Sequence, residues 1–455
     1  MGRAYNVIDA DGHILEPLDL WDKYIDRKFR DRAPKVVKAE NGKERLVIEE
    51  HAVGDSRIGI GRIGAVGARQ GVVEADTMAY KDGKPGGFDP HKRIPDMDAD
   101  GIDAVFLYPS LGLFSGAIRD PELAAAVCRA YNRWLADYCK PYPDRLFGVA
   151  MLPMQSIDLA IAEMRFARKE LGFRGGFLRP NPYNNKMIHH PDYEPFWAAA
   201  EDLDFSIGFH EGASSGMPTV GIDRFEGRGA QHIISHTMEM MLACMSVIWG
   251  GVCERHPKIR IAFLESGGGW IAPWLDRMDR HFDDQGFNDS GLKTRPSELF
   301  LRNCWISFEP VEGSLKVLAD YIGPNKILWA TDYPHSDGFF PGAPKMMLDR
   351  LEGVFPGDQA RRHGRRGNGL LRAALALGHR PGERAARRAV VFDDRGLPPR
   401  IPLREIRAGA RRQCAASATC WRSSLHRRND GDRPCWCRNT SAPARRRSRA
   451  AARLR

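Results

Sequence analysis

The chain has 455 residues, and its 43% of hydrophobic residues can form a sizeable core, which excludes wholesale disorder and a collagen-like architecture. Its formal net charge is +10, which by itself would suggest an anionic polymer as a partner. No run of about 18 apolar residues and no apolar secretory segment at the N-terminus is visible, so we expect neither a membrane-spanning helix nor a membrane partner. The cysteines before residue 360 lack disulfide or zinc spacing, and this predicts a cytoplasmic protein.

Short apolar segments recur from the N-terminus to about residue 355 and alternate with helical patterns. Runs rich in Val, Ile, Leu and Phe are typical of parallel strands that are covered on both faces. We predict strands at Asn6–Asp11, Asp103–Tyr108, Leu146–Leu152, Gly175–Arg179, Phe205–His210, Ile259–Glu265, Cys304–Phe308 and Ile327–Thr331.

Segments with apolar residues at three- and four-residue spacing lie between most of these strands. This alternation favours an α/β fold of the (β/α)8 TIM barrel type. An open doubly wound sheet is the alternative, but no G-x-G-x-x-G follows a strand. We predict helices at Pro121–Tyr138, Ile157–Leu171, Tyr193–Leu203 and Gly269–Phe282.

A segment rich in glycine and charge, about residues 22–89, interrupts the alternation. We interpret it as a long insertion after the first strand. Such an insertion could cap the mouth of a barrel or form a mobile surface excursion, and the sequence favours neither.

Carboxylates and histidines stand at the ends of several predicted strands. Asp11 and His13 end the first strand on one face, and His210, Glu265 and Asp332 end three later ones. The C-terminal ends of parallel strands in a barrel meet at one rim, where burying unpartnered charge is costly. Turn chemistry or satisfied core polar groups could explain one such residue, but a divalent cation would explain their convergence, so we predict a metal site.

Four motifs, IDADGHILEP, GFHEGA, ERHPKIRIAFLESGGGWIAPWLDRMD and KILWATDYPHSDG, resemble the amidohydrolase superfamily. The resemblance is to the amidohydrolase-related group that includes aminocarboxymuconate-semialdehyde decarboxylase, and it covers about residues 5–355. It implies a (β/α)8 barrel that holds one divalent ion, zinc or manganese, at its C-terminal rim. The ligands that it implies are Asp11, His13, His210 and Asp332.

Two departures from the pattern of these relatives affect the chemistry. Decarboxylases commonly read H-x-H at the first strand, where this chain has Asp11 and His13, and the harder oxygen donor makes manganese as suitable as zinc. The sixth strand often ends in a catalytic histidine, where this chain has Glu265. A glutamate serves as an acid or base if burial or a neighbouring charge raises its pKa.

Further residues are candidates for binding the substrate. Arg179 ends the fourth strand, and a rim arginine suits bidentate binding of a carboxylate. His335 follows Asp332 by three residues and is expected to face the mouth. His236 could project toward the site or belong to the core. Glu16, just beyond His13, could support a ligand from behind, but we favour its interpretation as a helix-start carboxylate.

Two reactions fit these residues. In non-oxidative decarboxylation of a small organic acid, a positioned acid protonates the carbon that loses CO2. In hydrolysis of an amide, ester or lactone, an activated water attacks a carbonyl. Asp332, Glu265 and His210 are the expected catalytic residues in either case. The resemblance favours a carbon–carbon lyase acting on a carboxylic acid, with hydrolysis of a carbonyl substrate as the alternative, and a homodimer is possible.

The positive charge lies in the C-terminal tail. Residues 360–455 contain 26 Arg, no Lys and six acidic residues, a net charge of +20, and the rest of the chain has a net charge of −10. The tail has no nucleic-acid-binding motif, so nucleic-acid binding is a disfavoured alternative. We expect a metal-dependent barrel over residues 1–358 and a disordered tail over residues 359–455, and the Arg-only composition suggests a frameshift product.

Overall fold

The structure is a computed structural model, and it describes residues 5–54, 59–68, 71, 74, 75, 77–212 and 216–352. The predicted Arg-rich tail, residues 359–455, lies outside the described residues. The fold below is that of the described part of the chain.

Parallel strands form the centre of the fold, and nearly every residue in them is buried. Their order is β1-β5-β6 in one sheet and β7-β8-β9-β10-β11-β12 in a second. These strands are β1 (Ile8–His13), β5 (Ala104–Tyr108), β6 (Leu146–Gly148), β7 (Ala150–Met151), β8 (Gly175–Leu178), β9 (Ser206–Phe209), β10 (Ile261–Phe263), β11 (Cys304–Phe308) and β12 (Ile327–Trp329).

Backbone hydrogen bonds lie at both places where the two sheets meet, between β6 and β7 and between β12 and β1. Only Val149 separates β6 from β7, and its N–H donates to the carbonyl of Leu107 on β5 at 3.1 Å. Beyond β12, the N–H of Asp332 donates to the carbonyl of Asp11 at 3.1 Å. The N–H of His13 donates to the carbonyl of Tyr333 at 2.7 Å. The end of β1 therefore lies directly beside the segment that follows β12.

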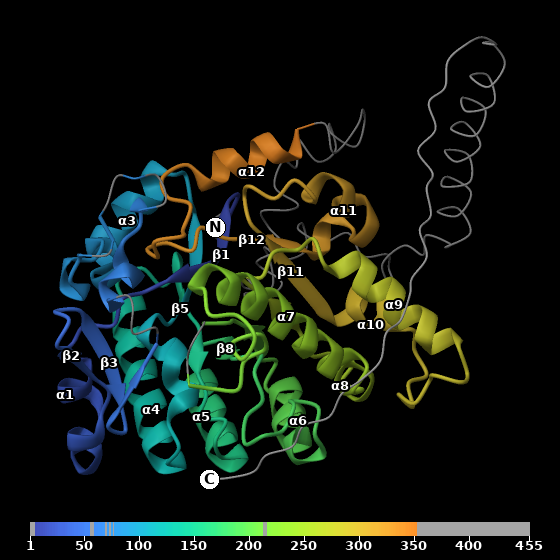
Figure 1. Cartoon of the computed structure of the whole chain (residues 1–455), viewed down its shortest axis with the longest axis horizontal. Coiled ribbons are helices and arrows are strands. Elements are labelled where there is room, and N and C mark those ends of the chain that lie inside the picture. Colours follow the sequence, from blue (N-terminus) through green and yellow to red (C-terminus); the bar gives the residue numbers. More distant parts are fainter. Residues whose placement is uncertain are drawn as a thin grey trace, which may run out of the picture. The chain divides into compact units, whose positions relative to one another are not determined.

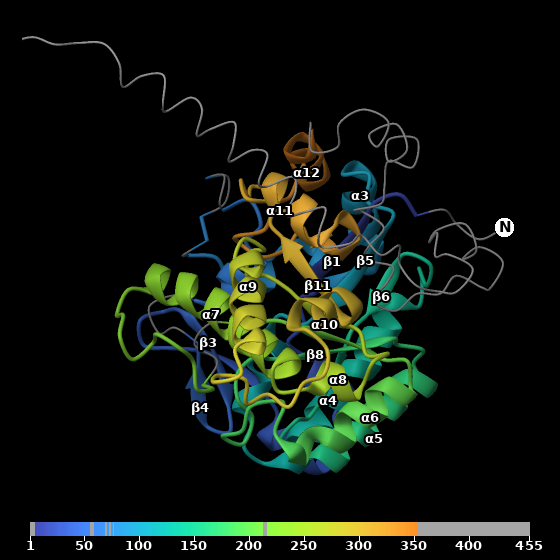
Figure 2. The same ribbon diagram turned by 90° about the vertical axis from the view of Figure 1, so that its right-hand side faces the viewer.

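Helices cover the strands, and α4, α5 and α6 lie side by side along one flank (Figures 1 and 2). The first of them begins where its sequence predicts, because the Asp120 carboxylate accepts the backbone N–H groups of Glu122 and Leu123. The helices are α1 (Leu20–Tyr24), α2 (Pro85–Phe88), α3 (Pro90–Ala99), α4 (Pro121–Cys139), α5 (Ile157–Lys169), α6 (Glu194–Asp202), α7 (Arg228–Ile248), α8 (Val252–Arg255), α9 (Ile271–Asp283), α10 (Pro296–Asn303), α11 (Leu315–Ile322) and α12 (Ala343–Leu351).

The segment between β1 and β5 contains a small sheet of its own. Strands β2 (Lys35–Lys38), β3 (Glu44–Ile48) and β4 (His51–Val53) pair antiparallel. Farther along the segment, the N–H of Val66 donates to the carbonyl of Pro334 at 3.0 Å. The predicted insertion therefore contacts the loop that follows β12, where two of the predicted site residues lie.

One described segment, Arg228–Arg255, is long and apolar enough to cross a membrane by length and composition alone. Half of its most apolar window is buried inside the protein. Polar residues on α7, among them His236 and Glu239, belong to this buried side. A core helix of a folded domain has the same properties.

Candidate metal centre

Four predicted ligands converge at the C-terminal ends of β1, β9 and β12. The Nε2 atoms of His13 and His210 are 3.0 Å apart. The Asp11 carboxylate approaches them at 3.6 Å from His13 and 3.4 Å from His210, and Asp332 lies 3.3 Å from His13. All four side chains are buried, so the cluster combines two imidazoles and two carboxylates in one small volume.

The imidazole hydrogen bonds direct a lone pair of each histidine into this cluster. The Nδ1 of His13 lies 2.8 Å from the carbonyl of Pro109, and the Nδ1 of His210 lies 2.6 Å from the carbonyl of Glu211. A carbonyl can only accept, so each Nδ1 carries the proton, and in the neutral ring Nε2 is left with a lone pair. Metal-ligating histidines are commonly oriented in this way by a carbonyl on the other ring nitrogen.

The carboxylate oxygens supply the strongest indication that a cation fits here. Both carboxylate oxygens of Asp11 are buried without a hydrogen-bond partner among the described residues, and the buried Oδ1 of Asp332 has only the ion-pair contacts of His13 at 3.3 Å and His335 at 2.9 Å. Buried charged oxygens are costly unless they are paired or coordinate a metal. A divalent cation among the Nε2 and carboxylate atoms would satisfy all three oxygens at once, so the residues present fit a metal ion.

The protonation equilibria agree with a shortage of positive charge. Burial raises the pKa of Asp332 well above its ordinary value, and the carboxylates of Glu265, Asp337 and Asp11 raise it further. Burial lowers the pKa of His210, but Asp11 and Glu265 outweigh it and raise that pKa to about 9. The cluster needs a positive charge, which either a proton on His210 or a metal cation can provide.

The backbone is unusual at two predicted site residues. Asp332 has φ of 53° and Glu265 has φ of 45°, both in the left-handed region. This region costs a side-chain-bearing residue roughly 1–3 kcal/mol and is concentrated at functional sites. The two carboxylates are therefore held at the strand ends against a conformational preference.

Glu265 and His335 both lie at the edge of the ligand cluster. The Oε2 of Glu265 is 3.1 Å from the Nε2 of His210, and burial raises the pKa of Glu265 to about 8. The His335 ring stacks on His13 at 3.9 Å, with its Nδ1 2.9 Å from Asp332 and its Nε2 2.8 Å from the Ser110 hydroxyl. Glu265 and His335 therefore lie in the site, as predicted. The catalytic role of Glu265 and the substrate contact of His335 stay predictions.

Arg179 is fully buried, and each of its side-chain nitrogens has a protein partner. Its guanidinium donates to the Glu211 carboxylate at 2.9 Å, to the Asn181 side chain at 3.1 Å and to the carbonyl of Leu113 at 3.2 Å. Glu211 directly follows His210, so the observed contacts of Arg179 support the chain beside a ligand. Its predicted contact with a substrate carboxylate stays a prediction.

Sequence reasoning did not identify two residues at the mouth, His232 and Asp337. The Nε2 of His232 lies 3.4 Å from the Oδ2 of Asp337, and its ring stacks on His236 at 3.9 Å. The four-residue spacing of the two histidines on α7 was the available signal, because such residues share one face of a helix.

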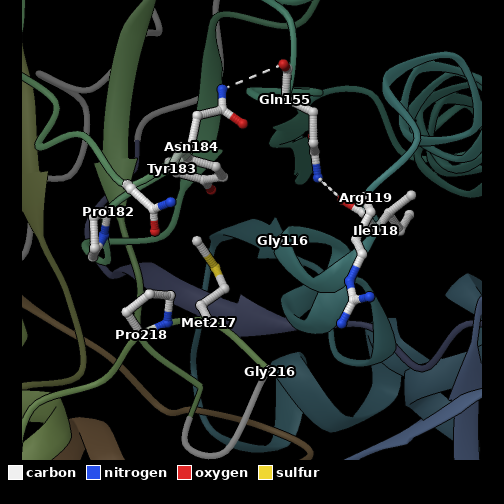
Figure 3. Close-up of a pocket in the computed structure, with 11 residues that line it drawn as sticks. Gly116, Ile118, Arg119, Gln155, Pro182, Tyr183, Asn184, Gly216, Met217 and Pro218 are labelled. Carbon is white, nitrogen blue, oxygen red and sulfur yellow. Dashed lines mark hydrogen bonds between the residues drawn. The ribbon is translucent and has the colours of Figure 1, made fainter.

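A cavity of about 230 Å³ opens near the ends of β7 and β8, and none of the four predicted ligands lines it (Figure 3). The Asn181 side chain, which accepts from Arg179, donates to the carbonyl of Pro218 in the cavity wall. The lining residues are Gly116, Ile118, Arg119, Gln155, Pro182, Tyr183, Asn184, Asn185, Gly216, Met217 and Pro218.

Comparison with known proteins identifies the family. A profile described as amidohydrolase matches residues 8–368, most of the chain. The chain belongs to the amidohydrolase family. This family consists of enzymes, and the matched residues include all four predicted metal ligands.

Two curated relatives and two solved structures illustrate the similarity. The 2-amino-3-carboxymuconate-6-semialdehyde decarboxylase of Dictyostelium discoideum is 27% identical over 54% of this chain and 67% of its own length. The gamma-resorcylate decarboxylase of Rhodococcus jostii is 25% identical over 57% of this chain and 83% of its own.

The solved structures share the fold. An amidohydrolase from Mycobacterium avium subsp. paratuberculosis is 23% identical, with a TM-score of 0.67 over 83% of this chain and all of that one. A dihydroxybenzoic acid decarboxylase from Polaromonas, crystallised with manganese and 2-nitroresorcinol, is 19% identical. Its TM-score is 0.53 over 81% of this chain and 98% of its own. The described α/β body therefore has the fold of amidohydrolases.

Proposed function

We propose that this protein is a divalent-metal-dependent enzyme that removes a carboxyl group as CO2 from a small aromatic or unsaturated acid, without an oxidant. The observation that carries the proposal is the convergence of Asp11, His13, His210 and Asp332 on one buried point, where both carboxylate oxygens of Asp11 lack a hydrogen-bond partner among the described residues. The two curated relatives described above are decarboxylases of such acids, which favours this reaction within the family.

The four converging side chains are the proposed ligands. When bound, a divalent cation supplies the positive charge that holds a substrate carboxylate and its neighbouring oxygen. Manganese is the ion that we propose, because Asp11 provides an oxygen donor at the first strand and the Polaromonas enzyme was crystallised with manganese. Zinc is the competing ion.

Glu265 is the proposed acid. Its pKa of about 8 keeps a proton on the carboxyl at neutral pH, and its Oε2 is 3.1 Å from His210 in the ligand cluster. When the bond between the carboxyl carbon and its neighbour breaks, the electron pair stays on the neighbouring carbon. Glu265 then gives its proton to that carbon, and CO2 leaves. His335 is proposed to contact the substrate beside Asp332.

A closed (β/α)8 barrel is the architecture that we propose for the strands. If β6 and β7 are one strand interrupted at Val149, the two sheets form a single parallel series from β1 to β12. The hydrogen bonds from Asp332 to Asp11 and from His13 to Tyr333 support closure between the two ends of that series. The amidohydrolase fold of the solved neighbours also supports it.

The experiment is a measurement of CO2. The manganese-loaded protein is incubated with dihydroxybenzoic acids and with unsaturated amino- or hydroxy-substituted dicarboxylic acids, and released CO2 is quantified. We expect turnover that falls at least about 100-fold in Asp332→Asn, since one ligand carboxylate is lost. Asp349→Asn, on the exposed face of α12, is the matched control and should keep full activity.

Hydrolysis of an amide, ester or lactone is the second candidate. It is favoured by Glu265, because a carboxyl group 3.1 Å from His210 could also orient a water molecule against a carbonyl. Turnover of esters or lactones by the same preparation, with no CO2 from any acid, would replace the decarboxylase proposal with this one.

A further inference from the structure

The carboxylate of Asp9 connects the two chain segments that carry the proposed aspartate ligands. Its Oδ1 accepts the backbone N–H groups of Asp11 at 3.2 Å and of Thr331 at 3.1 Å. Its Oδ2 accepts the Thr331 hydroxyl at 2.5 Å. Thr331 directly precedes Asp332, so one buried carboxylate holds the backbone of the first aspartate ligand and the residue next to the second.

The first strand is irregular at this point. From Asp9 to Gly12 the chain advances by three residues, while the partner strand β5 advances by two, from Val105 to Leu107. An extra residue in one strand of a pair is a β-bulge, which bends the strand and re-aims side chains beside active sites. A regular strand would place Asp9 and Asp11 on the same face. The bulge breaks this alternation, and the hydrogen bond from the Asp11 N–H to Asp9 lies within it.

The packing around Gly12 fixes the Asp9 carboxylate against the bulge. A Cβ on Gly12 would lie 3.2 Å from the Oδ2 of Asp9 and 2.6 Å from the Nη2 of Arg93. Arg93 is itself buried and donates from Nη1 to the carbonyl of His13 at 2.5 Å. Its guanidinium lies over the Tyr333 ring, 4.4 Å from the centroid. A side chain at position 12 would therefore displace the groups that hold the two segments together.

We propose that Asp9 is a positioning residue of the metal site, whose carboxylate maintains the bulge that aims Asp11 and ties the segment of Asp332 to it. Both oxygens of Asp9 accept hydrogen bonds from the protein, so it acts through the ligands and not as a ligand. The inference rests on the proposed function for the identity of the ligands. The competing role is structural only, in which the same bonds hold β1 against the segment after β12 and the ligands do not depend on them.

Two replacements of Asp9 separate these roles. In Asp9→Ala, two N–H groups and one hydroxyl lose their acceptor, and we expect the dissociation constant for Mn²⁺ to rise roughly 10–100-fold, as it does for other residues that orient metal ligands. In Asp9→Asn the side-chain oxygen can still accept both N–H groups, and the amide can donate to the Thr331 oxygen. We therefore expect Asp9→Asn to bind Mn²⁺ with nearly the affinity of the wild type.

The experiment is a Mn²⁺ titration of the full-length protein, in which electron paramagnetic resonance measures the free ion, together with the visible absorption spectrum of the Co²⁺-loaded protein. We expect Asp9→Ala to keep one Mn²⁺ per chain, with weaker binding and a changed Co²⁺ spectrum, because the ligands are present but misplaced. Asp9→Asn should restore both readouts.

Glu163→Gln is the matched control. The buried Glu163 carboxylate on α5 contacts Arg129 at 2.7 Å and Asn132 at 2.8 Å, both on α4, so its replacement weakens a buried network that contains no proposed ligand. We expect this variant to have a lower melting temperature, with the Mn²⁺ dissociation constant and the Co²⁺ spectrum of the wild type.

If Asp9→Ala does not fold, two replacements of Thr331 take its place. Thr331→Val removes the hydroxyl that Asp9 accepts, and Thr331→Ser keeps it. We expect the dissociation constant for Mn²⁺ to rise in Thr331→Val and to stay near the wild-type value in Thr331→Ser. Equal dissociation constants in these two variants would then overturn the inference.

The outcomes separate this inference from the proposed function. A folded Asp9→Ala with the dissociation constant and Co²⁺ spectrum of the wild type would overturn the positioning role. An equal loss of affinity in Glu163→Gln would also overturn it, because the effect would then follow stability. No bound Mn²⁺ in the wild type would overturn the proposed metal site and this inference with it. Mn²⁺ binding that depends on Asp9, without CO2 release from any acid, would overturn the proposed reaction and support the inference.

Discussion

Glu16 holds the start of the segment after β5, and its replacement gives a sharp test of how this mouth is built. The fully buried carboxylate accepts backbone N–H groups from Ser110 at 3.0 Å, Leu111 at 2.9 Å and Gly112 at 2.9 Å. The Ser110 hydroxyl in turn lies 2.8 Å from His335. We predict that Glu16→Gln lowers the free energy of unfolding by about 3 kcal/mol.

The magnitude follows from the three bonds. Two N–H groups reach Oε1 and keep an acceptor that is now neutral, which weakens each bond by about 1 kcal/mol. The third N–H, from Leu111, faces an amide N–H in the variant and is left unsatisfied at about 1–3 kcal/mol. Burial raises the pKa of Glu16, so removing its charge recovers part of this loss.

Urea denaturation followed by tryptophan fluorescence measures the effect. Glu40→Gln, on an exposed residue of the β2–β3 connection, is the control and should change the unfolding free energy by less than about 0.5 kcal/mol. A loss below about 1 kcal/mol in Glu16→Gln, with an unchanged urea slope, would refute the account of this loop.

Three further predictions concern a buried glutamate on α7, the insertion after β1 and the metal site. Burial raises the pKa of Glu239 to about 7 from 4.5, so its folded form holds an extra proton between these values. The stability of the wild type relative to Glu239→Gln should therefore increase as the pH falls from 8 to 5, and this gain should be lost as the pH rises through about 7. A difference in melting temperature that does not change with pH would contradict this. Gly61→Ala should destabilise the protein by about 1–3 kcal/mol, because a Cβ there would lie 1.9 Å from the carbonyl oxygen of Met78 in the insertion. Gly59→Ala, whose Cβ meets nothing nearer than 3.7 Å, should be tolerated, and equal melting temperatures would refute the clash. Removing metal with EDTA should lower the melting temperature, and free Mn²⁺ at 100 times its dissociation constant should raise the free energy of unfolding by about 2.7 kcal/mol. An unchanged melting temperature on adding Mn²⁺ would contradict binding of the ion to the folded protein.

The strands and the residues at their ends could be predicted from the sequence. Continuous apolar runs define strands that are buried on both faces, and β11 has the predicted bounds, Cys304–Phe308. The C-terminal ends of parallel strands lie on one face of the fold whatever the conformation of the loops. The convergence of Asp11, His210 and Asp332 therefore follows from the alternation of strands and helices. The structure brings these three side chains together as predicted.

Contacts between distant segments could not be predicted in this way. Glu16 was interpreted as a helix-start carboxylate, but it lies before α1 and instead accepts N–H groups from a segment that begins at Ser110, 94 residues away. Arg179 was expected to face a substrate, and its burial against Glu211 depends on packing that its own segment does not encode. Which face of α7 turns inward decides whether His232 reaches the mouth, and that depends on the tertiary structure.

The central claim is that Asp11, His13, His210 and Asp332 bind a divalent ion. The most direct measurement is an anomalous difference map from crystals of the manganese-loaded protein. A peak within about 2.3 Å of the Nε2 atoms of His13 and His210 and of both aspartate carboxylates is the result that we predict. Anomalous density confined to other positions, or its persistence at that position in Asp332→Ala and Asp11→Ala alike, would contradict the claim.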